Sequence, residues 1–129
     1  MNGNIKKVVM VVDDEPLILE VCREHLESAG YSVLAARNAK QALKQMREQH
    51  VDAVFLDIIM PEKDGLETLL QIKKTWPKLP VFVMSGGGRT GTNCFLDAAK
   101  AFGADGKLKK PFSASDMLTL LKSRDLAKA

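Results

Sequence analysis

The sequence predicts an α/β fold built on a parallel β-sheet. Short apolar runs rich in β-branched residues alternate along the chain with segments of helical periodicity. The alternation repeats five times in strict order, which is typical of parallel strands joined by right-handed helical crossovers. The length of 129 residues suits one ordinary domain, and a hydrophobic content of 46% is enough for a sizeable core.

Five runs are expected to be strands because they are short, apolar and lack helical spacing. The run KKVVMVV is continuous and β-branched, as strands buried on both faces of a parallel sheet are. The run DAVFLD is similar but ends in a charged residue. The expected strands cover residues 6–12, 31–36, 52–57, 80–85 and 105–110.

Five intervening segments are expected to be helices. The first has Pro16 in its opening turn and Gly30 as its stop. Asn38 suits the cap of the second helix, and Ser113 with Asp116 forms a capping box at the start of the last. The expected helices cover residues 15–30, 38–50, 66–76, 92–103 and 113–127.

Composition and charge exclude several classes of function. The formal net charge of +3 is far from the dense basic stripe of a nucleic-acid-binding protein, so no direct contact with nucleic acid is expected. No apolar run approaches the roughly 20 residues that span a membrane. Cys22 and Cys94 lack metal-type spacing and no secretory signal is present, so we expect reduced thiols in a cytoplasmic protein.

Polar residues at the strand ends form the candidate site, because ligands of such folds bind where the carboxyl ends of parallel strands meet. Asp13 and Asp14 follow the first strand, and Asp57 ends the third. Ser85 ends the fourth strand and Lys110 ends the fifth. Alone, Asp14 could cap a helix, Ser85 could open a loop and Lys110 could be a solvated side chain. The conjunction of all five is far more specific.

Asp57 most needs an explanation, because it lies between the apolar runs VFL and IIM. A charged carboxylate in such surroundings is costly unless something pairs with it. Clustered carboxylates repel one another unless a cation neutralises them, and Mg²⁺ prefers a few carboxylates, water and phosphate. A carboxylate beside a metal ion and an ammonium can accept a phosphoryl group. We therefore expect Asp57 to be held by a metal ion and Lys110, and to be phosphorylated.

Four motifs, VVDDEP, FLDIIMPEKDG, VMSG and GADGKLKKPF, together resemble the receiver domain of two-component response regulators. The resemblance covers essentially the whole chain. It implies a flavodoxin-like, doubly wound (βα)5 sandwich whose five-stranded parallel sheet has the order 2-1-3-4-5. It also implies a single, stand-alone receiver domain over residues 1–129, with its core at 6–127 and no output domain.

The resemblance implies a phosphoacceptor and a metal site. Asp57 would take the phosphoryl group from the phosphohistidine of a sensor histidine kinase or a histidine phosphotransfer protein. Asp14, Asp57 and the backbone carbonyl of Ile59 would bind Mg²⁺ or Mn²⁺. Asp13 would complete the acidic pocket, partly through metal-bound water.

The resemblance also implies a switch. Lys110 would pair with the phosphoryl group, aimed by a cis bond to Pro111, a residue that tolerates this isomer. Ser85 would move toward the phosphoryl oxygen. The result would be a changed affinity for a downstream protein target, or a relay of the phosphoryl group.

Three features depart from the usual family pattern. Lys107 stands where the family usually has an aromatic residue, which indicates either a modified switch surface or a solvent-exposed lysine. The stretch SGGGRTGTN, with Gly86 near its start, is either a loop that settles on phosphorylation or an ordinary surface loop, and Arg89 is a candidate contact of the phosphoryl group or an acidic partner. Ile59 and Gly87 border the path of attacking water and are expected to alter the lifetime of the acyl phosphate.

Two alternative functions stay open. A phosphorylation-independent interaction module is favoured by Lys107, but the intact Asp14, Asp57, Ser85 and Lys110 speak against it. A hydrolase with an aspartyl-phosphate intermediate commonly adds a general acid close to the nucleophile, and the sequence DIIM offers none. The leading hypothesis is a phosphoacceptor that is not an enzyme, although it assists its own phosphorylation and dephosphorylation.

Overall fold

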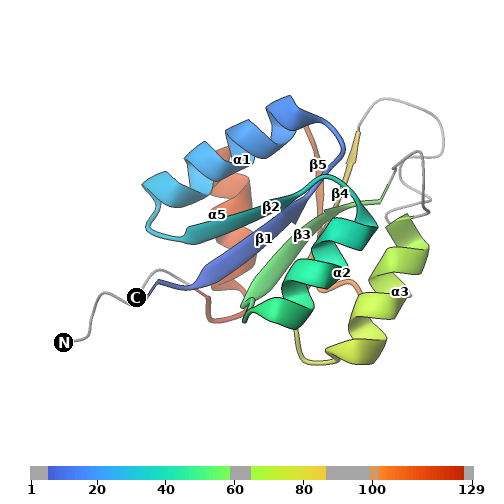
Figure 1. Cartoon of the computed structure of the whole chain (residues 1–129). Coiled ribbons are helices and arrows are strands. Elements are labelled where there is room, and N and C mark those ends of the chain that lie inside the picture. The colour runs from blue at the N-terminus through green and yellow to red at the C-terminus, as the bar shows by residue number, and fades with distance from the viewer. Residues whose placement is uncertain (1–5, 59–64, 87–99, 101, 127–129) are drawn as a thin grey trace.

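A five-stranded parallel sheet forms the centre of the molecule. The structure is a computed structural model that describes residues 6–58, 65–86, 100 and 102–126. The order β2-β1-β3-β4-β5 confirms the predicted topology (Figure 1). The strands are β1 (Val8–Val12), β2 (Ser32–Ala36), β3 (Ala53–Asp57), β4 (Val81–Gly86) and β5 (Gly106–Lys110).

Helices cover both faces of the sheet, which confirms the doubly wound arrangement. Figure 1 shows α1 and α5 on one face and α2 and α3 on the other. The bounds are α1 (Pro16–Ser28), α2 (Ala39–Glu48), α3 (Gly65–Thr75) and α5 (Ala114–Lys122). The helix expected at 92–103 lies almost wholly outside the described residues.

Side-chain caps fix two helix starts as the sequence predicts. Asn38 accepts a hydrogen bond from the Gln41 amide at 2.8 Å, and both bonds of the Ser113–Asp116 capping box are present. Gly30, just beyond α1, has a positive φ of 99°.

The last helix ends earlier than the expected residue 127. It stops at Lys122, and Asp125 takes a left-handed conformation with φ 60°. The Leu126 amide then donates to the Leu121 carbonyl at 2.9 Å, and this carbonyl also accepts from the Arg124 amide at 3.1 Å. The expectation was wrong because the apolar spacing continues through Leu126 while the backbone has already turned.

Two apolar clusters, one on each face of the sheet, hold the layers together. One contains buried residues of α2 and α3, and the other contains buried residues of α1 and α5. All five residues of β3 are buried, as expected for the central strand of a covered sheet. Phe55 and Phe82 pack with ring centroids 5.2 Å apart. This ring contact links β3 to β4, the two strands that carry Asp57 and Ser85.

Candidate functional site

The strand register brings three buried polar side chains to one edge of the sheet. Val12 pairs with Leu56, and Asp57 pairs with Met84. Asp13 and Asp57 therefore lie at the same level of the sheet, and Ser85 on β4 lies one residue further along. Asp13 and Ser85 are fully buried and Asp57 is 3% exposed. Buried polar groups in such a place require partners.

Three carboxylates converge at this edge. Asp13, Asp14 and Asp57 each offer an oxygen, and these oxygens lie within 4.8 Å of one another. Three negative charges at this distance repel unless a cation lies among them. Carboxylate oxygens are hard ligands that suit Mg²⁺ or Mn²⁺, and the partial exposure of Asp14 leaves a side open to water. The donor set therefore fits a divalent cation, and Ile59, the expected carbonyl ligand, lies outside the described residues.

The ammonium of Lys110 lies beside the three carboxylates and partly offsets their negative charge. Its Nζ lies 2.8 Å from Asp13 Oδ2 and 3.6 Å from Asp57 Oδ2. Burial lowers the pKa of Lys110, but the hydrogen bond to Asp13 and the charges of Asp57, Asp13 and Glu15 outweigh it and leave the pKa above its ordinary value. The side chain is therefore a fixed cation at neutral pH.

Both oxygens of Asp13 have partners. Oδ2 accepts from Lys110, and Oδ1 accepts from the backbone amide of Glu15 at 2.9 Å. The Asp13 amide donates in turn to the Ala36 carbonyl on β2 at 3.0 Å. Asp13 thus joins β2, the entry to α1 and the lysine at the end of β5. This positioning role was not foreseen from the sequence, which assigned Lys110 to the phosphoryl group.

The remaining expected residues vary in their placement. Ser85 is buried at the end of β4, and its Oγ makes a long, weak hydrogen bond of 3.4 Å to the Gly86 carbonyl. The Lys110–Pro111 peptide bond is cis. Lys107 is exposed on β5, and Gly86 is exposed with room for a Cβ. Arg89 and Gly87 lie outside the described residues.

Two residues near the site were not singled out from the sequence. Gly65 begins α3 so close to β3 that a Cβ would overlap the backbone of Ile58, the residue after Asp57. The Asp-Gly pair that ends FLDIIMPEKDG was the available signal. Glu15 Oε1 lies 3.8 Å from Lys110 Nζ, and its place directly after the two aspartates was the signal there.

The comparisons with known proteins give the family of the chain. The family model for the response regulator receiver domain matches residues 9–122. The chain belongs to the response regulator receiver domain family. Members of this family are phosphoacceptors of two-component systems.

Curated relatives of this receiver domain include response regulators of mycobacteria. "Response regulator MprA" of Mycolicibacterium vanbaalenii is 35% identical over 116 residues, which are 89% of this chain and 48% of the relative. The same protein of Mycobacterium avium is 34% identical and covered to 49%. The chain thus spans about half the length of the curated relatives it matches.

Solved receiver domains have the same fold. A CheY-like receiver domain protein of Methanospirillum hungatei matches with a TM-score of 0.81 at 28% identity, over 93% of this chain and 94% of that one. NtrX of Brucella abortus matches with a TM-score of 0.82 at 35% identity, over 95% of this chain and 27% of that one. In the described part of the receiver domain, every helix is too short or too polar to cross a membrane.

Proposed function

We propose that this receiver domain accepts a phosphoryl group on Asp57 from the phosphohistidine of a sensor histidine kinase or a histidine phosphotransfer protein. The observation that carries the proposal is the position of Asp57. Asp57 is 3% exposed, its Oδ2 lies 3.6 Å from Lys110 Nζ, and one of its oxygens lies within 4.8 Å of an oxygen of Asp13 and of Asp14. A nucleophile in such surroundings needs positioning and charge neutralisation more than a catalytic base.

The chain's own residues position and neutralise the reacting groups. A carboxylate oxygen of Asp57 forms a bond to phosphorus while the phosphorus–nitrogen bond of the donor breaks, and the donor imidazole leaves with a proton from solvent. Asp13, Asp14 and Asp57 would hold Mg²⁺, which would supply positive charge to offset that of the phosphoryl group. Lys110, already held at the cluster, pairs with the added charge, and Ser85 offers a hydroxyl from β4.

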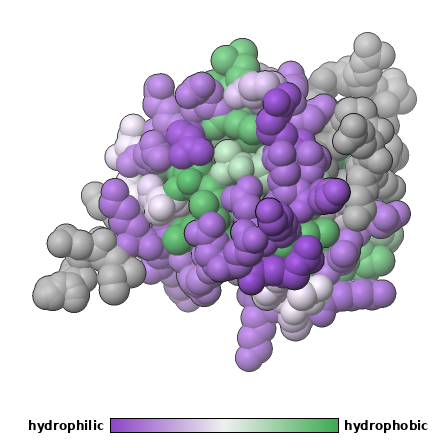
Figure 2. Space-filling view, in the orientation of Figure 1, coloured by the Kyte–Doolittle hydropathy of each residue, from purple (hydrophilic) through white to green (hydrophobic). Residues whose placement is uncertain are grey.

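An apolar surface beside the site supports a protein donor. Leu17 and Val21 on α1 are 72% and 38% exposed. A hollow next to them is lined by Ile18, Val21, Lys110, Pro111 and Phe112. Hydrophobic atoms along the upper edge of Figure 2 lie over the amino-terminal half of α1. An apolar helix face that borders the acceptor suits a partner that must bring its phosphohistidine to Asp57.

The output follows from the added charge. Phosphorylation of Asp57 adds negative charge to the buried site. This charge attracts the Lys110 ammonium and the Ser85 hydroxyl, and their movement changes the adjacent surface. The result would be a changed affinity for a protein target, or a relay of the phosphoryl group, and not turnover of an external substrate. A cytoplasmic setting is part of the proposal, since the Cys22 thiol would stay reduced there.

A phosphorylation-independent interaction module is the second candidate. The observation that favours it is the exposure of Lys107 on β5, where a lysine cannot pack inward as an aromatic ring does. Under this function, a partner would bind the wild-type protein and Asp57→Asn equally before and after treatment with a phosphoryl donor.

The deciding experiment is incubation with acetyl phosphate and Mg²⁺, followed by measurement of intact mass. A single phosphate adduct is expected on the wild type and on Asp125→Asn, a matched change at an exposed aspartate far from the site. The adduct should be absent from Asp57→Asn and in the presence of a chelator. An adduct that persists on Asp57→Asn would overturn the proposal.

Failure of the wild type to show an adduct would leave two explanations, which beryllofluoride separates. This ion mimics the acyl phosphate without hydrolysing. Shifts of the amide spectrum around Asp57 would indicate rapid loss of the phosphoryl group, whereas an unchanged spectrum would contradict the phosphoacceptor function.

A further inference from the structure

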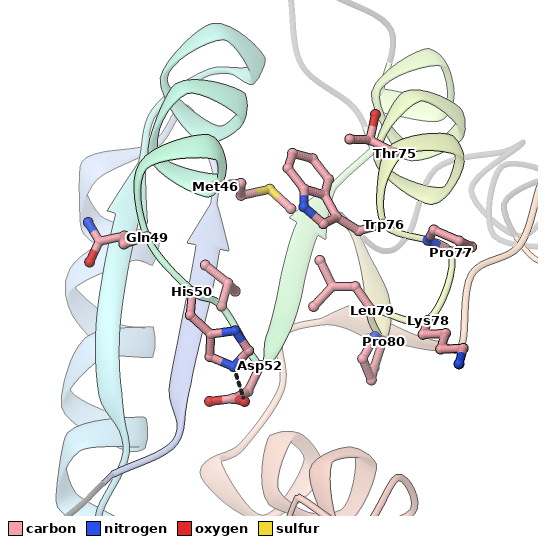
Figure 3. Close-up of a pocket in the computed structure, with 11 residues that line it drawn as sticks. Met46, Gln49, His50, Asp52, Thr75, Trp76, Pro77, Lys78, Leu79 and Pro80 are labelled. Atoms are coloured by element: carbon pink, nitrogen blue, oxygen red, sulfur yellow. Dashed lines mark hydrogen bonds and ion pairs between the residues drawn. The ribbon is translucent and has the colours of Figure 1, made fainter.

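A pocket of about 490 Å³ lies at the opposite end of the sheet from Asp57 (Figure 3). It lies between the carboxyl-terminal ends of α2 and α3, next to the starts of β3 and β4. Figure 3 shows the side chains of Met46, Trp76 and Leu79 pointing toward one another in it. Such a pocket suits a bulky apolar side chain. The apolar residues that line it are Met46, Val51, Trp76, Pro77, Leu79 and Pro80.

Polar side chains also line the pocket, and most of them have partners within the chain. Asp52 Oδ1 lies 2.7 Å from His50 Nε2, and Asp52 Oδ2 accepts from a backbone amide of β1 at 2.7 Å. Thr75 Oγ1 donates to a carbonyl one turn earlier in α3 at 3.0 Å. Figure 3 shows the polar ends of Gln49 and Lys78 pointing away from the apolar lining. Among the described residues, the acid of the lining is thus engaged, whereas the ammonium of Lys78 has no partner.

Three exposed basic residues form a stripe along α2 beside the pocket. Lys40, Lys44 and Arg47 follow the spacing i, i+4, i+7, which places them on one side of the helix. Gln45 lies on the other flank, because its Nε2 donates to the Ala35 carbonyl of the edge strand β2 at 3.2 Å. Since the apolar face of α2 packs on the sheet, helical spacing puts the basic stripe on the flank toward α3.

Two further lysines extend this positive charge across α3. Lys74 is exposed on α3, and Lys78 is exposed in the turn that follows it. In the part of the chain that the structure describes, neither these two nor the three cations of α2 form an ion pair. The acidic residues of α2 and α3 are Glu48 and Glu67, so positive charge is in excess. Unpaired positive charge of this kind attracts an acidic partner.

The five cations and the pocket together form what we call the α2–α3 surface. We propose that the α2–α3 surface binds an acidic segment of a protein partner, which places a bulky apolar side chain in the pocket and its carboxylates against the cations. Nucleic acid is also anionic, but it has no aliphatic or aromatic side chain to fill the apolar lining, and the net charge of +3 is small for a nucleic-acid-binding protein. The proposal does not depend on phosphorylation of Asp57.

The single tryptophan of the chain lines the pocket, so it reports directly on occupation. The probe is the synthetic peptide acetyl-Glu-Asp-Glu-Phe-Glu-Asp-Glu-amide, titrated while the indole N–H signal of Trp76 is followed in the ¹⁵N spectrum. A saturable shift is expected. The same peptide with alanine in place of phenylalanine keeps every charge, and it should bind about tenfold more weakly, the effect of losing one buried aromatic side chain.

A pair of charge changes tests the basic stripe. Lys44→Gln together with Arg47→Gln removes two exposed cations, so the fold should persist, and the phenylalanine peptide should bind about fivefold more weakly, the combined effect of two exposed ion pairs. Lys109→Gln together with Lys122→Gln removes the same charge from exposed positions on β5 and α5 and should bind as the wild type does. The amide spectrum of each variant reports that it is folded.

The inference is overturned if the phenylalanine peptide gives no saturable shift with the wild type. It is also overturned if the two peptides bind equally, or if the two double variants weaken binding alike. An oligothymidylate of eight residues forms a further arm. Its failure to shift the Trp76 signal would support the acidic protein segment, whereas tighter binding than that of the phenylalanine peptide would replace this partner with single-stranded nucleic acid.

Discussion

The ammonium of Lys110 lies 3.6 Å from Asp57 Oδ2, close enough for strong attraction but beyond the usual length of a hydrogen bond. Its short hydrogen bond of 2.8 Å goes to Asp13. The lysine is therefore held beside the proposed acceptor by another carboxylate. This arrangement lets Lys110 neutralise charge added at Asp57 without first being recruited from solvent.

Replacement of this lysine should slow phosphorylation without removing the acceptor. We expect Lys110→Ala to lower the initial rate with acetyl phosphate by about 100-fold, the usual effect of deleting one preorganised group that stabilises developing charge. Intact mass against time gives the rate. Lys109→Ala, at the exposed neighbouring position on β5, should keep the wild-type rate. Equal rates in Lys110→Ala and wild type would show that the proximity to Asp57 has no role in transfer.

Metal binding should stabilise the fold through Asp14. At a concentration of 100 times its dissociation constant, Mg²⁺ should add about 2.7 kcal/mol to the free energy of unfolding of the wild type. In a chelator, Asp14→Asn should be more stable than the wild type, because one of three repelling charges is gone. Thermal unfolding with Mg²⁺ and with chelator checks both effects. Equal stabilisation of Asp14→Asn and wild type by Mg²⁺ would exclude Asp14 as a ligand.

Much of the fold could be predicted because its signals are local. Short apolar runs predicted the strands, and helical spacing predicted the helices. The caps at Asn38 and Ser113 depend only on residues within one helical turn. The alternation of strands and helices then placed Asp13, Asp57 and Ser85 at one sheet edge, because parallel strands share the end at which they stop.

The contacts between site residues could not be predicted from the sequence, because they join parts of the chain that are far apart in sequence. Asp13 and Lys110 are 97 residues apart in sequence, and their hydrogen bond forms only when β5 lies in place. Likewise, Gly65 looks like an ordinary helix start until α3 packs against β3. The early end of α5 depends on the conformation of Asp125, which apolar periodicity does not report.

Gly65 should be intolerant of any side chain. The Cβ of Gly65→Ala would overlap the backbone of Ile58, which a rotamer change cannot relieve, so α3 or the end of β3 must move. We expect a loss of about 1–3 kcal/mol in the free energy of unfolding and slower phosphorylation of the adjacent Asp57. Urea unfolding and the acetyl phosphate assay measure the two effects. Gly86→Ala, where a Cβ meets nothing within 4 Å, is the control and should leave stability unchanged.

The Cys22 thiol should be inert in the folded protein. Burial, and then the charge of Asp13, raise its pKa from 9.0 to about 12. Because the folded-state pKa is the higher one, the contribution of Cys22 to stability is complete below pH 9 and is lost as the pH rises through 12. In a Cys94→Ser background, a thiol reagent at about pH 8 should react only after urea unfolding. Fast reaction of the native protein would contradict this burial.

Asp105 should stabilise the end of the sheet opposite the site. Its carboxylate is 3.0 Å from Lys73 Nζ and 2.9 Å from Arg124, and it accepts from the Val81 amide at 2.8 Å. Asp105→Ala leaves a half-buried lysine and a backbone amide without this partner, so we expect a loss of about 3 kcal/mol in the free energy of unfolding. Glu27→Ala, which breaks an exposed pair on α1, should cost less than about 1 kcal/mol. Equal urea midpoints for the two variants would show that burial adds nothing to the Asp105 network.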